Sequence, residues 1–138
     1  MTTLSHLRLP FLLGAAGMVV TSCHSLTADK SVRVLDVVGQ NLTKLDVSAN
    51  TNLQELYCSF PLKKLNASGC PNLRRLVCYC TLLSTLDVSA HTRMEWLACE
   101  GGQLTNLNMS GCSSLEKVTC GNNQLTSLDL SGCTNLQR

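Results

Sequence analysis

A repeat of about 21 residues runs through most of the 138-residue chain and constrains its fold more than any other feature. Alignment on the leucine that follows each polar turn divides residues 32–138 into five units and the start of a sixth. The units are residues 32–52, 53–72, 73–93, 94–114 and 115–135, and the second is one residue shorter than the others. One unit cannot bury its apolar edge alone, so the series predicts a solenoid in which each coil packs on its neighbours.

Each unit has two apolar arms separated by polar turns. The first arm reads Leu-x-x-Leu-x-Cys, as in Leu73-Arg-Arg-Leu-Val-Cys78. The second arm reads Leu-x-x-Leu-Asp/Asn-apolar-Ser, as in Leu83-Ser-Thr-Leu-Asp-Val-Ser89. The last apolar residues of each arm alternate between inward and outward positions, which is the pattern of a short strand with one buried face.

These spacings resemble leucine-rich repeats, and in particular the short cysteine-bearing repeats of internalin-like bacterial surface proteins. The resemblance covers residues 32–138. It implies a curved leucine-rich-repeat solenoid with a parallel sheet on the first arm, and members of the family mostly bind other macromolecules. Because about 21 residues leave no room for a helix, we expect a short strand or extended segment on the return arm. The predicted fold class is mostly parallel β, with short return arms and no regular helices in the repeats.

The first 31 residues lack the repeat and look like a targeting segment. Residues 9–20 form an apolar run behind a single arginine, too short for the roughly 20 residues that cross a bilayer and typical of a signal peptide. The tetrapeptide Val20-Thr-Ser-Cys23 resembles a bacterial lipobox. It implies a signal peptide over residues 1–22, a lipidated Cys23 and a tether over residues 23–31. An ordinary secretory signal with a nearby cysteine is the alternative.

The lipobox implies that the protein is lipid-anchored in the bacterial cell envelope, at the outer membrane or cell surface. Several buried acyl chains give stable attachment, since each buried methylene contributes about 0.8 kcal/mol. The membrane is therefore an expected partner through the lipid anchor.

The nine cysteines cannot all pair within the chain, because nine is odd. Placed in register, those after Cys23 fall into two columns, and Cys80 stands apart. The predicted core column of the first arm is Cys58, Cys78, Cys99 and Cys120. The predicted turn column after the second arm is Asn50, Cys70, His91, Cys112 and Cys133.

We expect the core column to consist of free thiols that pack as small apolar side chains. The turn column should satisfy backbone groups of the turns, as the asparagine ladder of leucine-rich repeats does. Disulfides along a column are not excluded by distance, since stacked strands lie about 4.8 Å apart. A metal site and a redox role for Cys80 are further alternatives, and the possible ligands are Cys70, Cys78, Cys80 and His91. We expect neither a metal nor a cofactor.

The outward positions of the first arm differ from unit to unit. Tyrosine, tryptophan and arginine, the types that dominate binding hot spots, fall on consecutive units. The predicted ligand-binding face is Tyr57, Arg74, Arg75, Trp96 and Lys117. The alternative is an ordinary solvated face.

The outward positions of the second arm are more uniform. One column alternates acid and amide, and consists of Asp46, Asn66, Asp87, Asn108 and Asp129. We expect these side chains to bind turn amides, with a calcium-binding face as the alternative. A basic cluster of Lys44, Lys63 and Lys64 is weak evidence for an anionic glycan or lipid surface.

Composition excludes several function classes. The net charge of +2 is too balanced for nucleic acid as a main partner. The chain holds no catalytic constellation with a credible geometry, so we expect no enzyme. We predict a non-catalytic protein-binding or adhesion module of an envelope lipoprotein. The alternatives are a glycan-binding module that uses Trp96 and Tyr57 as stacking platforms, and a fragment of a longer surface protein with further repeats.

Overall fold

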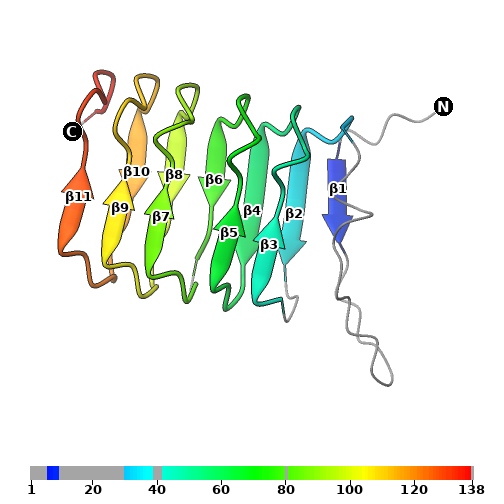
Figure 1. Cartoon of the computed structure of the whole chain (residues 1–138), viewed down its shortest axis with the longest axis horizontal. Helices are drawn as coiled ribbons and strands as arrows, with labels where there is room; N and C mark the ends of the chain where they lie inside the picture. Colours follow the sequence, from blue (N-terminus) through cyan, green and yellow to red (C-terminus); the bar gives the residue numbers. More distant parts are fainter. Residues whose placement is uncertain (1–5, 10–29, 39–41, 80, 138) are drawn as a thin grey trace.

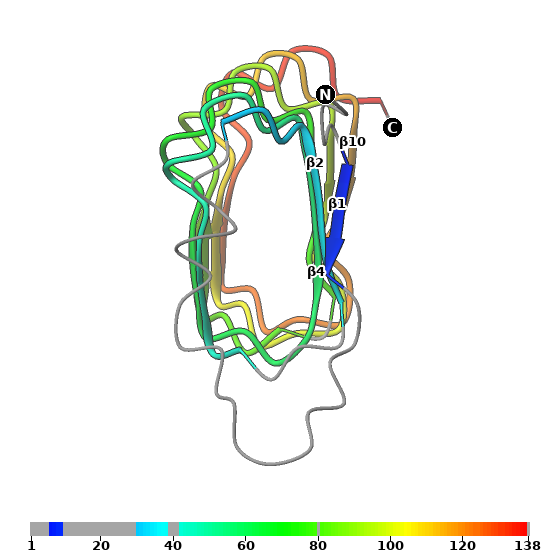
Figure 2. The same ribbon diagram turned by 90° about the vertical axis from the view of Figure 1, so that its right-hand side faces the viewer.

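The computed structural model describes residues 6–9, 30–38, 42–79 and 81–137. In these residues the chain winds into a parallel β-solenoid and forms no helix (Figures 1 and 2). Each repeat contributes one strand to each arm, so the return arm is a second short strand rather than a helix. The fold predicted from the repeat spacing is confirmed.

The first arms of the five repeats, together with one strand from the segment before them, form a six-stranded parallel sheet. The strands follow one another in the order β1 (His6–Leu9), β2 (Val34–Val38), β4 (Glu55–Ser59), β6 (Arg75–Val77), β8 (Trp96–Ala98) and β10 (Lys117–Thr119). Equivalent positions of successive repeats pair directly, as Glu55, Arg75, Trp96 and Lys117 do. The sheet therefore presents the outward residues of all repeats side by side.

The second arms form two separate sheets. The strands are β3 (Lys44–Asp46), β5 (Lys64–Asn66), β7 (Thr85–Asp87), β9 (Asn106–Asn108) and β11 (Ser127–Asp129). Strand β3 pairs with β5, and β7, β9 and β11 pair in that order, but β5 and β7 are not paired. Figure 1 shows β5 and β7 set farther apart than the other neighbouring strands of this arm.

Strand β1 pairs in parallel with β2, with His6 opposite Val34 and Leu9 opposite Val37. It lies inside the segment interpreted as a signal peptide. The remainder of that segment and Cys23 lie outside the described residues, as does most of the tether. Within the described ranges there is no helix with the length and apolarity of a bilayer-crossing segment.

The core fills the space between the two arms with stacked apolar side chains. The central leucine of each first-arm strand from β2 to β8 is at most 1% exposed, in the column Leu35, Leu56, Leu76 and Leu97. At the C-terminal end of the array, Leu128 and Leu130 are 46% and 37% exposed. No coil of the described chain covers β11, so the apolar side chains of the last coil remain accessible.

Candidate ligand-binding face

Trp96 lies on the outer side of the first-arm sheet, on β8, the strand next to the edge strand β10. Strands β6, β8 and β10 place Arg75, Trp96 and Lys117 in one row. The Arg75 Cζ lies 6.0 Å from the centroid of the Trp96 ring, and the Lys117 Nζ lies 5.3 Å from it. At about 6 Å or less a cation is attracted to the electron-rich face of an indole. Trp96 is therefore flanked by a positive charge on each neighbouring strand.

Acidic side chains orient the arginines and the tyrosine of this face. The Tyr57 hydroxyl donates to Glu55 Oε2 over 2.6 Å, and Arg75 Nη1 lies 3.7 Å from Glu55 Oε1. Arg74 Nη1 lies 3.5 Å from Glu95 Oε1. The hydrogen bond to Glu55, together with burial, raises the pKa of Tyr57. Exposed ion pairs of this kind contribute little stability, so their main effect here is to position the side chains.

The indole N–H of Trp96 is covered and has no hydrogen-bond partner among the described residues. A buried donor without an acceptor is costly, by about 1–3 kcal/mol. Trp96 therefore combines an N–H donor that has no acceptor with two neighbouring cations.

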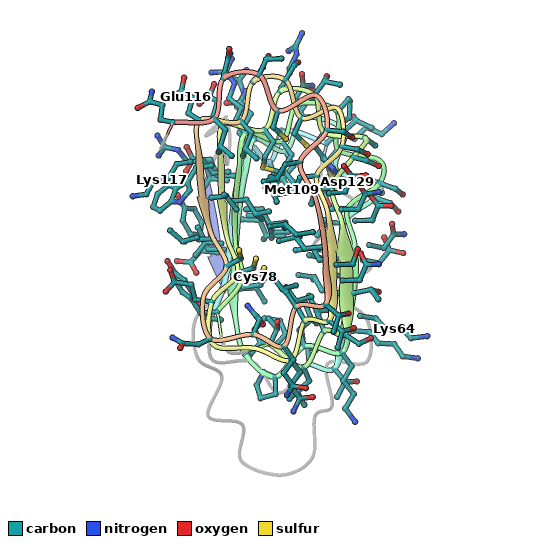
Figure 3. The ribbon with its side chains drawn as sticks, turned by 90° about the vertical axis from the view of Figure 1, so that its left-hand side faces the viewer. Lys64, Cys78, Met109, Glu116, Lys117 and Asp129 are labelled. Carbon is teal, nitrogen blue, oxygen red and sulfur yellow. The ribbon has the colours of Figure 1, made fainter. Side chains whose placement is uncertain are left out.

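The structure brings the five sequence-predicted residues onto one face and adds two that were not predicted. Contacts run from Tyr57 through Glu55 and Arg75 to Trp96 and Lys117, with Arg74 paired beside them to Glu95. Figure 3 shows Lys117 pointing away from the interior, on the side opposite Lys64 and Asp129. Glu55 and Glu95 were missed because their role depends on register. The available signal was the spacing of the acids from the arginines: Glu55 comes one repeat before Arg75, and Glu95 comes one repeat after Arg74.

Comparison of the chain with known protein families, curated proteins and solved structures gives no match. The function must therefore be argued from the repeat pattern and from the geometry of the surface.

Two positions that alternation places on the outside are buried. Val77 is 6% exposed and Ala98 is 0% exposed. They are register partners in the row next to Trp96, where small side chains sit low between larger neighbours. Val77 and Ala98 thus form a floor beneath the candidate ligand-binding face, whereas Tyr57 in the same row is part of that face.

The core cysteine column lies inside the first arm. Cys58, Cys78 and Cys99 are at most 1% exposed, and Cys120 is partly exposed. All seven cysteines of the described residues are free, and Figure 3 shows Cys78 pointing into the interior. The thiol hydrogen bond with Cys58, followed by burial, raises the pKa of Cys78, and burial raises that of Cys99. The burial and the free state of these thiols agree with the expectation that they pack as small apolar side chains.

Replacement of Cys99 by Ser is expected to lower the free energy of unfolding by about 1–3 kcal/mol, because a hydroxyl without a partner enters the core. Cys70→Ser is the matched control. The Cys70 Sγ donates to the Val47 carbonyl over 3.2 Å, and serine can keep this bond, so its cost should stay below about 1 kcal/mol. Chemical denaturation measures both. If Cys99→Ser left the free energy of unfolding unchanged, the core column would not be buried from solvent.

The turn column connects each coil to the preceding one. Three of its thiols donate to main-chain carbonyls at 3.1–3.2 Å, in the pairs Cys70–Val47, Cys112–Val88 and Cys133–Met109. Burial raises the pKa values of Cys70 and Cys112 to about 11, so both remain protonated donors at neutral pH. These side chains satisfy backbone groups of the turns.

His91 occupies the same column with a larger side chain. It is 3% exposed. Its Nε2 lies 3.1 Å from the Ala67 carbonyl oxygen, and its Nδ1 lies 3.2 Å from that of Val88. Both ring nitrogens are thus directed at carbonyls. Among the described residues, which exclude Cys80, no group of three His, Cys, Asp or Glu side chains is arranged to hold a metal ion.

The acid–amide column of the second arm binds the turn that follows each strand. In every repeat, the Oδ1 atom of the aspartate or asparagine in this column accepts a hydrogen bond from the main-chain N–H of the serine two residues later, at 2.9–3.3 Å. Asn66 Nδ2 also donates to Asp46 Oδ2 on the neighbouring strand over 3.1 Å. An amide between two acids thus links the column and dilutes its charge. These bonds match the turn-binding interpretation of the column.

Acid should destabilise the protein partly through this column. The N–H and hydroxyl of Ser89 lower the pKa of Asp87, and the hydroxyl and N–H of Ser131 lower that of Asp129. A carboxyl whose pKa is depressed by folding stabilises the protein above its unfolded pKa of about 3.9 and loses this contribution as the pH falls further. The Asp87→Asn/Asp129→Asn variant keeps the acceptor oxygens, so urea unfolding between pH 7 and pH 3 should show a weaker loss of stability. An equally steep loss would contradict this assignment.

Proposed function

We propose that this protein is a non-catalytic, protein-binding leucine-rich-repeat module of a bacterial envelope lipoprotein. The ligand-binding face is the outer side of β4, β6, β8 and β10, with the side chains Tyr57, Arg74, Arg75, Trp96 and Lys117. The observation that carries the proposal is the indole of Trp96, which has a cation beside it on each of the neighbouring strands β6 and β10. The repeat spacing and the lipobox-like tetrapeptide support the family and the envelope location.

A protein partner suits this face better than a sugar. Arg75 and Lys117 already lie against the Trp96 ring, where a stacked sugar would have to displace them. A partner with an acidic side chain gains from both cations and from the unused indole N–H. Tryptophan, tyrosine and arginine close together are the composition of an interface hot spot.

Affinity capture from envelope extract with the full chain tests this proposal. Trp96→Ala should lower the yield of the captured partner, and its affinity once purified should fall by at least about tenfold, the effect of a strong hot-spot residue. Asn106→Ala is the control, because Asn106 is an exposed side chain on β9 of the second arm, in a different sheet from this face. Equal affinities of wild type and Trp96→Ala would refute the proposed face. Glycan-array binding that is lost in Trp96→Ala would identify a sugar ligand instead.

The lipid anchor needs a separate test. Metabolic labelling with a palmitate analogue should label the wild-type chain expressed in a bacterium, and Cys23→Ser should abolish the label. Cys133→Ser is the control, because it removes a partly exposed thiol of the folded array. Persistent labelling of Cys23→Ser would contradict attachment at this residue.

A further inference from the structure

The second-arm sheet is open between β5 and β7. At the neighbouring junction of β3 and β5, the amides of Lys63 and Lys64 both donate to the Thr43 carbonyl, at 2.9 and 3.2 Å. The equivalent amides at the next junction belong to Ser84 and Thr85. Within the described residues, neither donates to the Lys63 carbonyl. The interruption therefore leaves the Ser84 and Thr85 amides, at the start of β7, without the acceptor that the equivalent amides have at the β3–β5 junction.

The opening is closed at both ends and has a defined length. At one end, the Leu82 amide donates to the Leu62 carbonyl over 2.8 Å. At the other end, His91 Nε2 lies 3.1 Å from the Ala67 carbonyl oxygen. Cysteine makes the corresponding contact in other coils, as Cys112 does. Because an imidazole reaches farther from its Cα than a thiol, His91 allows the coils to stand farther apart.

A hollow of about 490 Å³ occupies this opening. Its side-chain lining includes Lys44, Asp46, Lys63, Lys64, Leu65 and Leu83. Leu65 is half-buried, whereas Leu45 and Leu86, at the same repeat position, are buried. The lining therefore combines an apolar floor with a cationic rim. A concave site of a few hundred Å³ is typical of small-molecule binding, and the polar and charged side chains that dominate this lining favour a charged ligand.

Within the part of the chain that the structure describes, the charges around the hollow are not balanced. Lys44 and Lys64 are exposed register partners on neighbouring strands, an arrangement in which like charges repel. Among the described residues, no hydrogen bond or ion pair of the Lys44, Lys63 or Lys64 ammonium group is found. The single carboxylate of the lining, that of Asp46, accepts bonds from Ser48. Two positive charges remain in excess.

Three departures from the repeat sequence lie at the opening between β5 and β7. Lysine at position 63 stands where other repeats carry serine or threonine, as at Ser84 and Thr105. The turn after Cys58 is one residue short, and His91 is the one histidine of the turn column. None of these changes is needed for stacking, since the other coils stack without them.

We propose that the opening between β5 and β7, held apart by His91, is a binding site for a phosphate-bearing ligand. A phosphate monoester carries about −1.5 to −2 charges at pH 7, which matches the excess charge of the rim. The lysines donate to the phosphate oxygens, and the Ser84 and Thr85 amides add donors at the sheet edge. Leu65 and Leu83 contact an apolar group attached to the phosphate. This site is on the arm opposite the ligand-binding face and is independent of the proposed protein partner.

Calorimetric titration of the full chain with three probes tests the site. The probes are dihexanoyl phosphatidic acid, dihexanoyl phosphatidylcholine and inorganic phosphate. Phosphatidic acid should bind at least about tenfold more tightly than phosphatidylcholine, since a choline cation opposes the lysines. An inorganic phosphate affinity equal to that of phosphatidic acid would identify a free phosphate group as the ligand and would contradict the apolar contact with Leu65 and Leu83. A weaker inorganic phosphate affinity would support a lipid headgroup, whose acyl chains reach these leucines. Absence of binding by both phosphate probes would overturn the proposal.

Two variants with the same change in net charge locate the binding. Lys44→Gln/Lys63→Gln/Lys64→Gln should weaken the phosphatidic acid affinity at least about tenfold and should fold, because it removes repulsion between exposed groups. Arg74→Gln/Arg75→Gln/Lys117→Gln should bind within about twofold of wild type, a difference of under about 0.5 kcal/mol. An equal loss in both variants, or a loss confined to the second, would refute a site at β5 and β7.

The role of His91 has its own readout. His91→Cys introduces the residue of the other coils and should let β5 and β7 pair. Amide hydrogen exchange at Ser84 and Thr85 should then slow, and phosphatidic acid affinity should fall by about tenfold. A folded His91→Cys variant with unchanged exchange and unchanged affinity would contradict the spacer role.

Discussion

Leu107→Ala should lower the free energy of unfolding by about 2–5 kcal/mol, whereas Leu128→Ala should cost less than about 1 kcal/mol. The two leucines are register partners at the centre of β9 and β11. Leu107 is 0% exposed and also pairs with Leu86 on its other side. Its truncation leaves a cavity between two coils. Leu128 is 46% exposed, so its truncation removes little buried surface.

The two leucines are matched in residue type and repeat position, and each is the central residue of a three-residue strand, so differences in propensity cancel. Urea unfolding followed by circular dichroism at several protein concentrations measures both variants. A large cost for Leu128→Ala that grows with protein concentration would mean that another copy covers the end of the array. Equal costs that do not depend on concentration would contradict the exposure of β11.

Gly69→Ala should destabilise the protein by about 3 kcal/mol or more, the upper range for overpacking. A Cβ added at Gly69 would overlap the Ser48 carbonyl oxygen of the preceding coil. Both the oxygen and the Gly69 Cα belong to the main chain, so no side chain can move aside. The coils that carry β3 and β5 would have to separate at this turn.

Gly121→Ala is the control, because a Cβ there meets no heavy atom within 4 Å. Alanine already occupies the repeat position of Gly69 in two other coils, as Ala49 and Ala90. The conformation of the turn therefore accepts a side chain, and the expected cost comes from coil stacking alone. Thermal unfolding of Gly69→Ala close to that of Gly121→Ala would show that these two coils are not in such close contact.

The strands could be predicted because their signal is local. In Leu73-Arg-Arg-Leu-Val-Cys78, alternation requires that Leu76 points inward and Arg75 outward, and β6 places them so. Equal repeat lengths then bring equivalent residues into register, which is why the row of Arg75, Trp96 and Lys117 could be anticipated. Spacing alone carries this information, since each coil repeats the same geometry.

The break between β5 and β7 could not be predicted, because both strands carry the same apolar pattern as their neighbours. Whether two coils pair depends on the lengths of the turns and on the volume of the side chains between them. The sequence did contain two signals, the short turn after Cys58 and the large imidazole side chain of His91. Neither has a known relation to whether neighbouring strands pair. Burial of Ala98 was missed for a related reason. Alternation gives the direction of a side chain, not what its neighbours cover.

The turn column has a consequence for how this molecule opens. The hydrogen bonds from side chains to main-chain groups of another coil join residues 19–24 apart, which is the distance to the adjacent coil. A coil at the end is therefore held by one interface, and an internal coil by two. Protease access and solvent exchange at β11 should depend on detachment of that coil alone, while β6 and β8 remain closed until the array around them is lost.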